Sequence, residues 1–277
     1  MIGAIIGDIV GSRFEWTENK HKGFTFLTSS CHFTDDSMMT LAIAEAFLLR
    51  KGRWKEPDFQ EYVVSKMVKM GRKYSYMNTW GKYFYDWFMG NHSPYNSYGN
   101  GAAMRVSPVG WIAESEEDVK YYSQIVTEVS HNHPEGIKGA EAVAMAIYLA
   151  RIGTPMEEIR GRMIGYYPEI ASMTVDGIRP GYGYDEAGQW ITCQGSVPQA
   201  IVCFLESTSF EDAIRNAVSL GGDTDTQGCM AGAIAEAYYG IDPELEEKAM
   251  EFLPENLQSI CYAFSTVKLK RNKRKET

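Results

Sequence analysis

The chain has 277 residues, 44% hydrophobic and 23% charged, a globular composition that excludes disorder, collagen and coiled coil. Its 27 basic and 36 acidic residues give a net charge of −9. Six of the basic residues and one acidic residue lie in 268–277, which leaves an acidic body and argues against non-specific DNA binding.

Chain length and hydropathy restrict the number of domains and argue against a membrane-spanning or secreted protein. At roughly 150 residues per domain the chain allows one large domain or two small ones. The sequence has no low-complexity linker that would separate two domains, which favours one. No apolar run approaches the roughly 18 residues of a membrane span, and the apolar N-terminus lacks the basic stretch of a signal peptide. Five scattered cysteines without a CxxC pair are typical of reduced cytoplasmic thiols. We therefore expect a cytoplasmic monomer with one domain over 1–267 and a disordered basic tail over 268–277.

Helical periodicity dominates the chain, and no convincing strand pattern is found. In chain order, helices are predicted over Ser37–Leu49, Pro57–Lys69, Glu116–Val129, Gly139–Arg151, Met156–Tyr166, Val197–Glu206, Glu211–Leu220 and Gln227–Tyr239. Glycine, proline and asparagine mark loops over Asn91–Gly101 and Arg179–Gly188 and at the Gly221-Gly222 pair. The predicted fold class is all-α.

Two helices are unusually rich in small residues. Gly3, Gly7 and Gly11 recur every four residues and so lie on one helix face, and Gly228 and Gly232 stand among alanines in the last predicted helix. Glycine costs up to about 1 kcal/mol relative to alanine inside a helix. The repeats are therefore expected where backbones pack closely, deep in the core.

Two acidic clusters directly precede predicted core helices: Thr34-Asp35-Asp36 and Asp223-Thr224-Asp225-Thr226. Helix capping explains either cluster alone. Together they supply four carboxylates, which would repel one another if the helix N-termini converge, and a bound cation would relieve that repulsion. Oxygen ligands without nearby histidine or cysteine favour Mg²⁺, Mn²⁺ or Ca²⁺ over zinc. Two carboxylate pairs also suit a site with two metals.

Two further segments are candidates for binding. The loop over residues 96–101 runs into an apolar helix, which suits an anion held by backbone N–H groups, although a plain loop and cap fit as well. His131 and His133 stand two residues apart before Pro134 and could be metal ligands, hydrogen-bonding groups or surface residues. Zinc is disfavoured there, because no third histidine or cysteine is close in sequence.

Five motifs in order resemble the ADP-ribosylglycohydrolase family, which includes the dinitrogenase reductase-activating glycohydrolases. They are Gly7-Asp8-x-x-Gly11-x-x-x-Glu15, Thr34-Asp35-Asp36, Gly99-Asn100-Gly101-Ala102-Ala103-Met104-Arg105, His131-Asn132-His133-Pro134 and Gly222-Asp223-Thr224-Asp225-Thr226. The resemblance implies a compact orthogonal helical domain with two Mg²⁺ ions, or Mn²⁺, in a cleft. It also implies hydrolysis at C1″ of an ADP-ribosyl group on a protein side chain or small molecule, with release of ADP-ribose.

The resemblance also implies roles for individual residues. The expected metal ligands are Thr34, Asp35, Asp36, Asp223, Asp225 and Thr226. The expected substrate-binding residues are Ser97, Tyr98, Gly99, Asn100, Gly101, Arg105 and His131. Glu15, Asp36 and Asp223 are the catalytic candidates, and any of the three could take a proton from water. Asp8 is expected to be structural and to bond loop backbone near the site.

One position departs from the family pattern. The dinitrogenase reductase-activating members carry an aspartate, proposed as catalytic, just before an Asn-Thr pair, and Ser75 stands at the corresponding place before Asn78-Thr79. The motifs read only the ADP-ribosyl half of a substrate, so the leaving group stays open. A silent ADP-ribose-binding protein and a phosphoester hydrolase are the alternatives.

Overall fold

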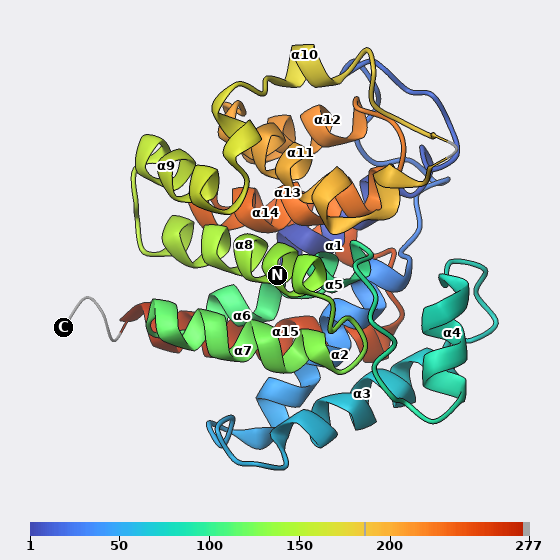
Figure 1. Cartoon of the computed structure of the whole chain (residues 1–277), viewed down its shortest axis with the longest axis vertical. Coiled ribbons are helices and arrows are strands. Elements are labelled where there is room, and N and C mark those ends of the chain that lie inside the picture. The colour runs from blue at the N-terminus through green and yellow to red at the C-terminus, as the bar shows by residue number, and fades with distance from the viewer. Residues whose placement is uncertain (186, 274–277) are drawn as a thin grey trace.

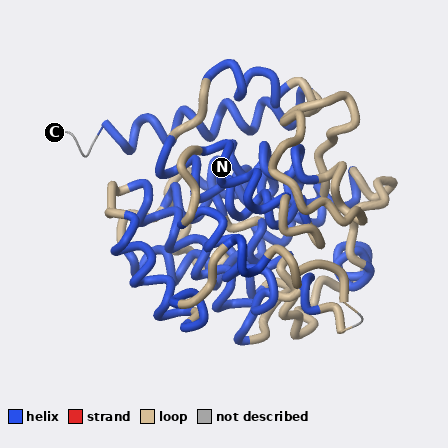
Figure 2. Tube along the Cα trace, turned by 90° about the horizontal axis from the view of Figure 1, so that it is seen from above, coloured by secondary structure: helices blue, strands red, loops and turns tan. Residues whose placement is uncertain are grey.

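The computed structural model of the chain describes residues 1–185 and 187–273 and is built from helices (Figure 1). Over these ranges it contains no strand (Figure 2). The one β-type pairing there is an isolated bridge between Gly99 and Thr192. The predicted all-α class is confirmed.

The helices follow one another with short connections along most of the chain. They are α1 (Ile2–Gly11), α2 (Asp35–Arg50), α3 (Phe59–Lys73), α4 (Lys82–Met89), α5 (Gly101–Met104), α6 (Ser107–Ile112), α7 (Glu116–Glu128), α8 (Pro134–Arg151), α9 (Met156–Tyr166), α10 (Val175–Ile178), α11 (Cys193–Leu205), α12 (Phe210–Val218), α13 (Thr224–Tyr239), α14 (Pro243–Met250) and α15 (Glu255–Lys273), with 3-10 turns at Pro168–Ala171 and Gln189–Ile191. Each of the eight predicted helical segments falls on one of these helices.

Several helices begin earlier than the sequence pattern predicts, and the differences at α8 and α13 bear on the site. Helix α8 starts at Pro134, because His133 Nδ1 accepts a hydrogen bond from the N–H of Glu135 (3.1 Å) and proline suits the first helical turn. Helix α13 starts at Thr224, so Asp225 lies in its first turn. Side-chain capping therefore sets the start of α8 before the apolar periodicity becomes visible, whereas Asp223 at the start of α13 makes no such capping bond.

Helices α1 and α13 pack backbone against backbone in the middle of the molecule (Figure 1). A Cβ atom added to Gly7 would lie 1.9 Å from the carbonyl oxygen of Gly228, and one added to Gly11 would lie 2.3 Å from that of Thr224. All ten residues of α1 are buried. The glycine repeat of the sequence thus forms a contact that admits no side chain, and it brings Asp8 close to the start of α13.

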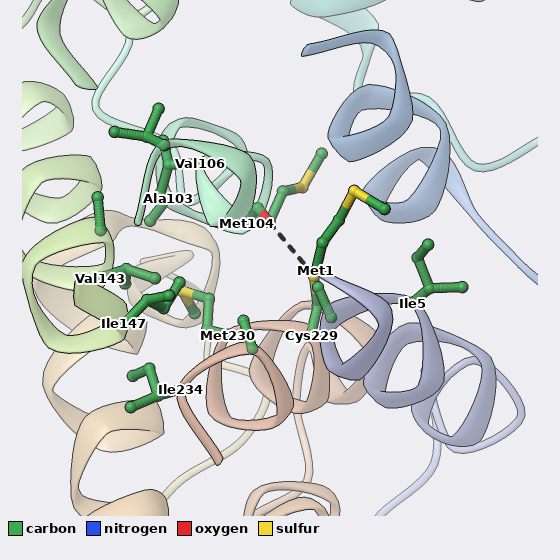
Figure 3. Close-up of a cluster of buried hydrophobic side chains, with 14 of the residues drawn as sticks. Met1, Ile5, Ala103, Met104, Val106, Val143, Ile147, Cys229, Met230 and Ile234 are labelled. Carbon is green, nitrogen blue, oxygen red and sulfur yellow. Dashed lines mark hydrogen bonds between the residues drawn. The ribbon is translucent and has the colours of Figure 1, made fainter. Parts of the chain in front are cut away.

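A close-packed apolar core supports the other side of α13. Ala103 and Met104 of the short helix α5 lie between α13 and α8, whose Ile147 belongs to the same cluster (Figure 3). The thiol of Cys229 donates a hydrogen bond to the Met104 carbonyl oxygen (3.3 Å), which fixes α5 against α13 (Figure 3). The loop that precedes α5 is therefore held against the N-terminal half of α13.

The predicted division into a domain and a basic tail stays a prediction. The backbone of α15 continues through Lys273, and residues 274–277 lie outside the described residues. None of the helices in the described ranges is long and apolar enough to cross a membrane.

A methyl group at Gly7 is expected to destabilise the fold, because overpacking of a core contact costs about 1–3 kcal/mol and here the obstacle is backbone. Urea unfolding of Gly7→Ala should show a loss of about 3 kcal/mol or more. Gly161→Ala is the matched control, since Gly161 is exposed in α9 with nothing within 4 Å of an added Cβ. That variant should gain up to about 1 kcal/mol from helix propensity. Equal stability changes in the two variants would contradict the packing.

Candidate active site

Asp8 joins the buried end of α1 to the start of α2. Its Oδ2 accepts hydrogen bonds from the N–H groups of Thr34 (3.0 Å) and Ser37 (3.1 Å) and from the Ser37 hydroxyl. Its Oδ1 accepts one from the Thr34 hydroxyl (2.7 Å). These N–H groups have no partner within a helix, so the carboxylate satisfies them and interacts favourably with the positive end of α2. The expected backbone contacts of Asp8 are present.

Asp36 and Thr226 connect α2 to α13. The Thr226 hydroxyl donates a hydrogen bond to Asp36 Oδ2 (3.2 Å), and both side chains are buried. The other oxygen, Asp36 Oδ1, is also buried and has no hydrogen-bond partner within the described part of the chain. A buried oxygen acceptor without a donor costs free energy, and a cation would satisfy it.

Five carboxylates form two overlapping acidic sets that share Asp225. Asp8, Asp36 and Asp225 form the first set, and Glu15, Asp223 and Asp225 form the second. Within each set, one oxygen of every member lies within 4.8 Å of the others. These oxygens are hard ligands of the kind that Mg²⁺, Mn²⁺ and Ca²⁺ prefer. The donor set, together with the unpaired oxygen of Asp36, fits a divalent cation, and each set could hold one.

Burial and mutual repulsion raise the pKa values of the carboxylates in the two acidic sets. Burial, and then the charge of Asp225, raise the pKa of Asp8 to about 7 and that of Glu15 to about 8. The same two causes raise the pKa values of Asp36 and Asp223 well above their usual range. At neutral pH the folded protein must therefore hold protons or cations among these groups.

The remaining predicted metal ligands lie beside the sets. Asp35, in the first turn of α2, is partly buried, and burial and the charges of Asp225 and Asp8 raise its pKa well above the usual range. It belongs to neither set, while Asp8, which was expected to be structural, belongs to the first. Thr34 caps α2, and its hydroxyl is bound to Asp8. Whether Asp35 binds metal stays a prediction.

The glycine-containing loop is anchored beside the second set. The Asn100 side chain donates from Nδ2 to Asp223 Oδ2 (2.7 Å), and the Asn100 N–H donates to the Ile191 carbonyl oxygen (2.8 Å). Ser97 Oγ accepts a hydrogen bond from the Gly99 N–H (3.1 Å). The loop therefore borders the carboxylates directly, through an asparagine contact that sequence spacing does not reveal.

His131 lies under this loop as a neutral ring. Its Nε2 is 3.3 Å from the position that a Cβ on Gly101 would occupy. Burial and the nearby Arg105 lower the His131 pKa well below the usual value. Arg105 donates to Ser130 Oγ (2.8 Å), which leaves the Ser130 hydroxyl hydrogen free for His131 Nδ1 (2.8 Å). We infer that Nε2 carries the ring proton and presents a hydrogen-bond donor to the loop.

The other predicted substrate-binding residues occupy different environments. Arg105 is fully buried, with its guanidinium turned toward Ser130 and the last carbonyls of α7, so it supports His131 from within. Tyr98 is 45% exposed and packs edge-on against His133, at 5.1 Å between ring centroids. Direct substrate contact by either residue stays a prediction. Ser75 follows the end of α3 and belongs to neither acidic set.

A cavity of about 310 Å³ lies next to the second acidic set, since its lining includes Gly222, the residue before Asp223. It is lined by residues that follow Glu15 and precede Asp223 in the sequence, together with the loop around Tyr184. Among its lining residues are Glu18, Lys20, Tyr182, Tyr184, Trp190 and Gly222. In the sequence this wall is marked by composition alone, because residues 179–195 are rich in glycine and aromatic residues, which suggests an edge of the cleft but shows no helical or strand period.

The comparisons with known proteins agree with one another. The sequence model of the family described as ADP-ribosylglycohydrolase matches residues 1–268. ADP-ribosylhydrolase ARH3 of Homo sapiens is 28% identical, over 95% of this chain and 88% of that protein. ADP-ribosylarginine hydrolase Tri1 of Pseudomonas putida (strain GB-1) is 26% identical, over 90% of this chain and 72% of that protein. A solved structure titled ADP-ribosylglycohydrolase-related protein complex superposes with a TM-score of 0.64 at 21% identity, covers 95% of each chain, and shows the same fold.

A divalent cation is expected to stabilise the protein through the shared carboxylate. Mg²⁺ at 100 times its dissociation constant should add about 2.7 kcal/mol to the free energy of unfolding and raise the melting temperature. Asp225→Asn should melt higher than the wild type in EDTA, because it relieves repulsion, and should not respond to Mg²⁺. Glu251→Gln, an exposed position after α14, is the control and should respond like the wild type. An equal Mg²⁺ response in Asp225→Asn would contradict the assignment.

The metal-free protein is expected to lose stability as the pH rises from 5 to 8. The folded-state pKa values of about 7 for Asp8 and about 8 for Glu15 lie above the unfolded values near 4, so the folded state binds more protons in this window. The free energy of unfolding then falls as the pH rises across the window. Urea unfolding in EDTA measures it, and Glu15→Gln should flatten the dependence. A stability that rises over this range would contradict the acidic cluster.

Proposed function

The chain belongs to the ADP-ribosylglycohydrolase family, and from this membership and its acidic site we propose that it cleaves the bond at C1″ of an ADP-ribosyl group, releasing ADP-ribose. The observation that carries the proposal is the pair of acidic sets sharing Asp225, bordered by the loop that Asn100 fixes to Asp223. The relatives whose printed names state ADP-ribosylhydrolase or ADP-ribosylarginine hydrolase support the reaction class.

Two divalent cations, Mg²⁺ or Mn²⁺, are proposed as cofactors. Thr34, Asp35, Asp36, Asp223, Asp225 and Thr226 would hold them, and the geometry adds Asp8 to the candidates. Bound cations would supply positive charge and Lewis acidity beside the hydroxyls of the reacting ribose. This assignment accounts for five carboxylates within two sets, which only protons or cations can stabilise at neutral pH.

The loop and His131 are proposed to bind the rest of the substrate. The loop over residues 97–101 would bind the diphosphate and the adjoining ribose through N–H groups other than those of Gly99 and Asn100, which already bond Ser97 Oγ and the Ile191 carbonyl oxygen. Glycine in this loop lets a ligand approach the chain closely. The Nε2 hydrogen of neutral His131 would donate to the same part of the substrate. A neutral donor suits this role because burial beside Arg105 prevents a second positive charge.

In the proposed reaction the bond from C1″ to the leaving atom breaks and a water oxygen bonds to C1″. The leaving group takes the bonding electron pair and gains a proton, and the water loses one. The carboxylates stabilise the positive charge that develops at C1″. Asp36 and Asp223 accept hydrogen bonds from Thr226 and Asn100, whereas Glu15 lies in a turn outside the helices. We therefore favour Glu15 as the residue that takes the proton from water and passes it to solvent.

The assay follows ADP-ribose by mass spectrometry after incubation with arginine- or serine-ADP-ribosylated peptides. The wild type should release ADP-ribose from one of them in Mg²⁺ and not in EDTA. Asp36→Asn should lower the rate at least about 100-fold, the scale expected when an electrostatic stabiliser of the transition state is lost.

Glu251→Gln, far in sequence from every motif, is the matched control and should keep the wild-type rate. ADP-ribose binding without release from either peptide would favour a silent binding protein, and phosphate release instead of ADP-ribose would favour a phosphoester hydrolase. Either result would contradict the proposed function. A cytoplasmic location and a monomeric state remain proposals.

A further inference from the structure

Two loops distant in sequence meet at the second acidic set. Residues 12–20 follow α1 and carry Glu15, and residues 180–185 with Gln189 and Trp190 form the opposite wall of the cavity. The turn Gly221-Gly222, directly before Asp223, lies against both. The contacts that hold residues 12–20 in place therefore also set the position of the Glu15 carboxylate.

Glu15 occupies a position that electrostatics opposes. One of its carboxylate oxygens lies within 4.8 Å of oxygens from Asp223 and Asp225, and these like charges repel. Glu15 is not in a helix, since α1 ends at Gly11. A restraint outside the acidic set must therefore keep the segment from turning away.

The backbone at Trp16 shows where this restraint acts. Trp16 has a φ of +63°, in the left-handed region that bulky residues rarely adopt. Its N–H donates a hydrogen bond to the hydroxyl of Tyr184. The Trp16 ring, although 70% exposed, stacks on the Tyr184 ring at 5.2 Å and an interplanar angle of 4°. The strained residue is held from both its backbone and its side chain by one tyrosine.

The same tyrosine hydroxyl reaches the acidic set from the other side. It donates to the Gly222 carbonyl oxygen (3.0 Å), one residue before Asp223. Burial raises the pKa of Tyr184, so the hydroxyl keeps the proton that this bond needs. Trp190 packs edge-on against Tyr184 at 4.7 Å and against Trp16 at 5.6 Å, which fixes the ring that carries the hydroxyl.

We propose that Tyr184 is a positioning residue, which holds Glu15 against Asp223 and Asp225 by bridging the Trp16 N–H to the Gly222 carbonyl. The effect on the reaction rests on the proposed function: Tyr184 does not touch the substrate and affects the rate only by positioning Glu15. Its hydroxyl connects the loop that carries Glu15 to the turn before Asp223. The distance between the Glu15 and Asp223 carboxylates therefore stays fixed.

A second attachment makes the proposal testable without loss of the fold. The Lys20 ammonium donates to the carbonyl oxygens of Tyr182 and Leu220, at the far end of the same loop. Tyr184→Phe removes the hydroxyl, keeps the aromatic ring and leaves the Lys20 contacts. The variant should therefore fold normally, with a loop that is loose only around residues 14–18, because Arg13 still donates to the Thr25 carbonyl oxygen.

Hydrogen–deuterium exchange tests the structural half without reference to activity. Tyr184→Phe should speed exchange at the amides of residues 14–18 at least ten-fold, while amides of α8 keep their wild-type rates. Tyr262→Phe, an exposed tyrosine of α15, is the matched control and should change neither region. Wild-type exchange rates at residues 14–18 in Tyr184→Phe would overturn the proposal.

A double-mutant cycle tests the catalytic half in the metal-loaded enzyme. Tyr184→Phe should lower kcat about ten-fold and change KM less than two-fold. In Glu15→Gln, measured at high enzyme concentration, adding Tyr184→Phe should cause no further loss beyond two-fold. The proposal would be overturned if the two substitutions lowered kcat by independent factors that multiply in the double variant. An unchanged kcat in Tyr184→Phe would overturn it as well. If the wild type releases no ADP-ribose, the proposed function fails, and the exchange experiment still decides whether Tyr184 fixes the loop.

Discussion

The contact between α1 and α13 is the constraint on which the candidate site depends. Gly7 meets Gly228 and Gly11 meets Thr224 with no room for a side chain, so the two helix axes lie as close as backbones permit. This approach places Asp8 next to Asp225. Any larger residue on the glycine face would separate the carboxylates as well as weaken the core. Fold and site are therefore specified by the same residues.

The carboxylates brought together in this way oppose folding unless something neutralises them. The N-terminus of α2 supplies part of the compensation, because Asp8 accepts hydrogen bonds from its first N–H groups. Asp36 keeps a buried oxygen that no donor among the described residues reaches, and Asp225 takes part in both acidic sets. A protein built only for stability would not retain this arrangement, because apolar residues would fill the same volume at lower cost. The unrelieved repulsion is the physical reason to assign the site to cations.

Local patterns predicted the helices well and the site in part. Acidic clusters at helix starts predicted Asp36 and Asp225 as site residues, and the structure brings the two into one acidic set. The spacing of Leu257, Cys261 and Phe264 also carries a helical signal for α15, which the sequence-based prediction passed over. The contact of Tyr184 with the loop of Glu15 joins residues 168 positions apart in the chain and has no local signature. Such contacts depend on how the loops fold over the helices, which periodicity does not encode.

The most direct test of this account is the location of Mn²⁺ in crystals of the wild-type protein by its anomalous scattering. Two peaks are expected, one bounded by Asp8, Asp36 and Asp225 and the other by Glu15, Asp223 and Asp225. The shared Asp225 would contribute to both. The absence of ordered Mn²⁺ from both positions, in crystals that hold it elsewhere on the surface, would contradict the account.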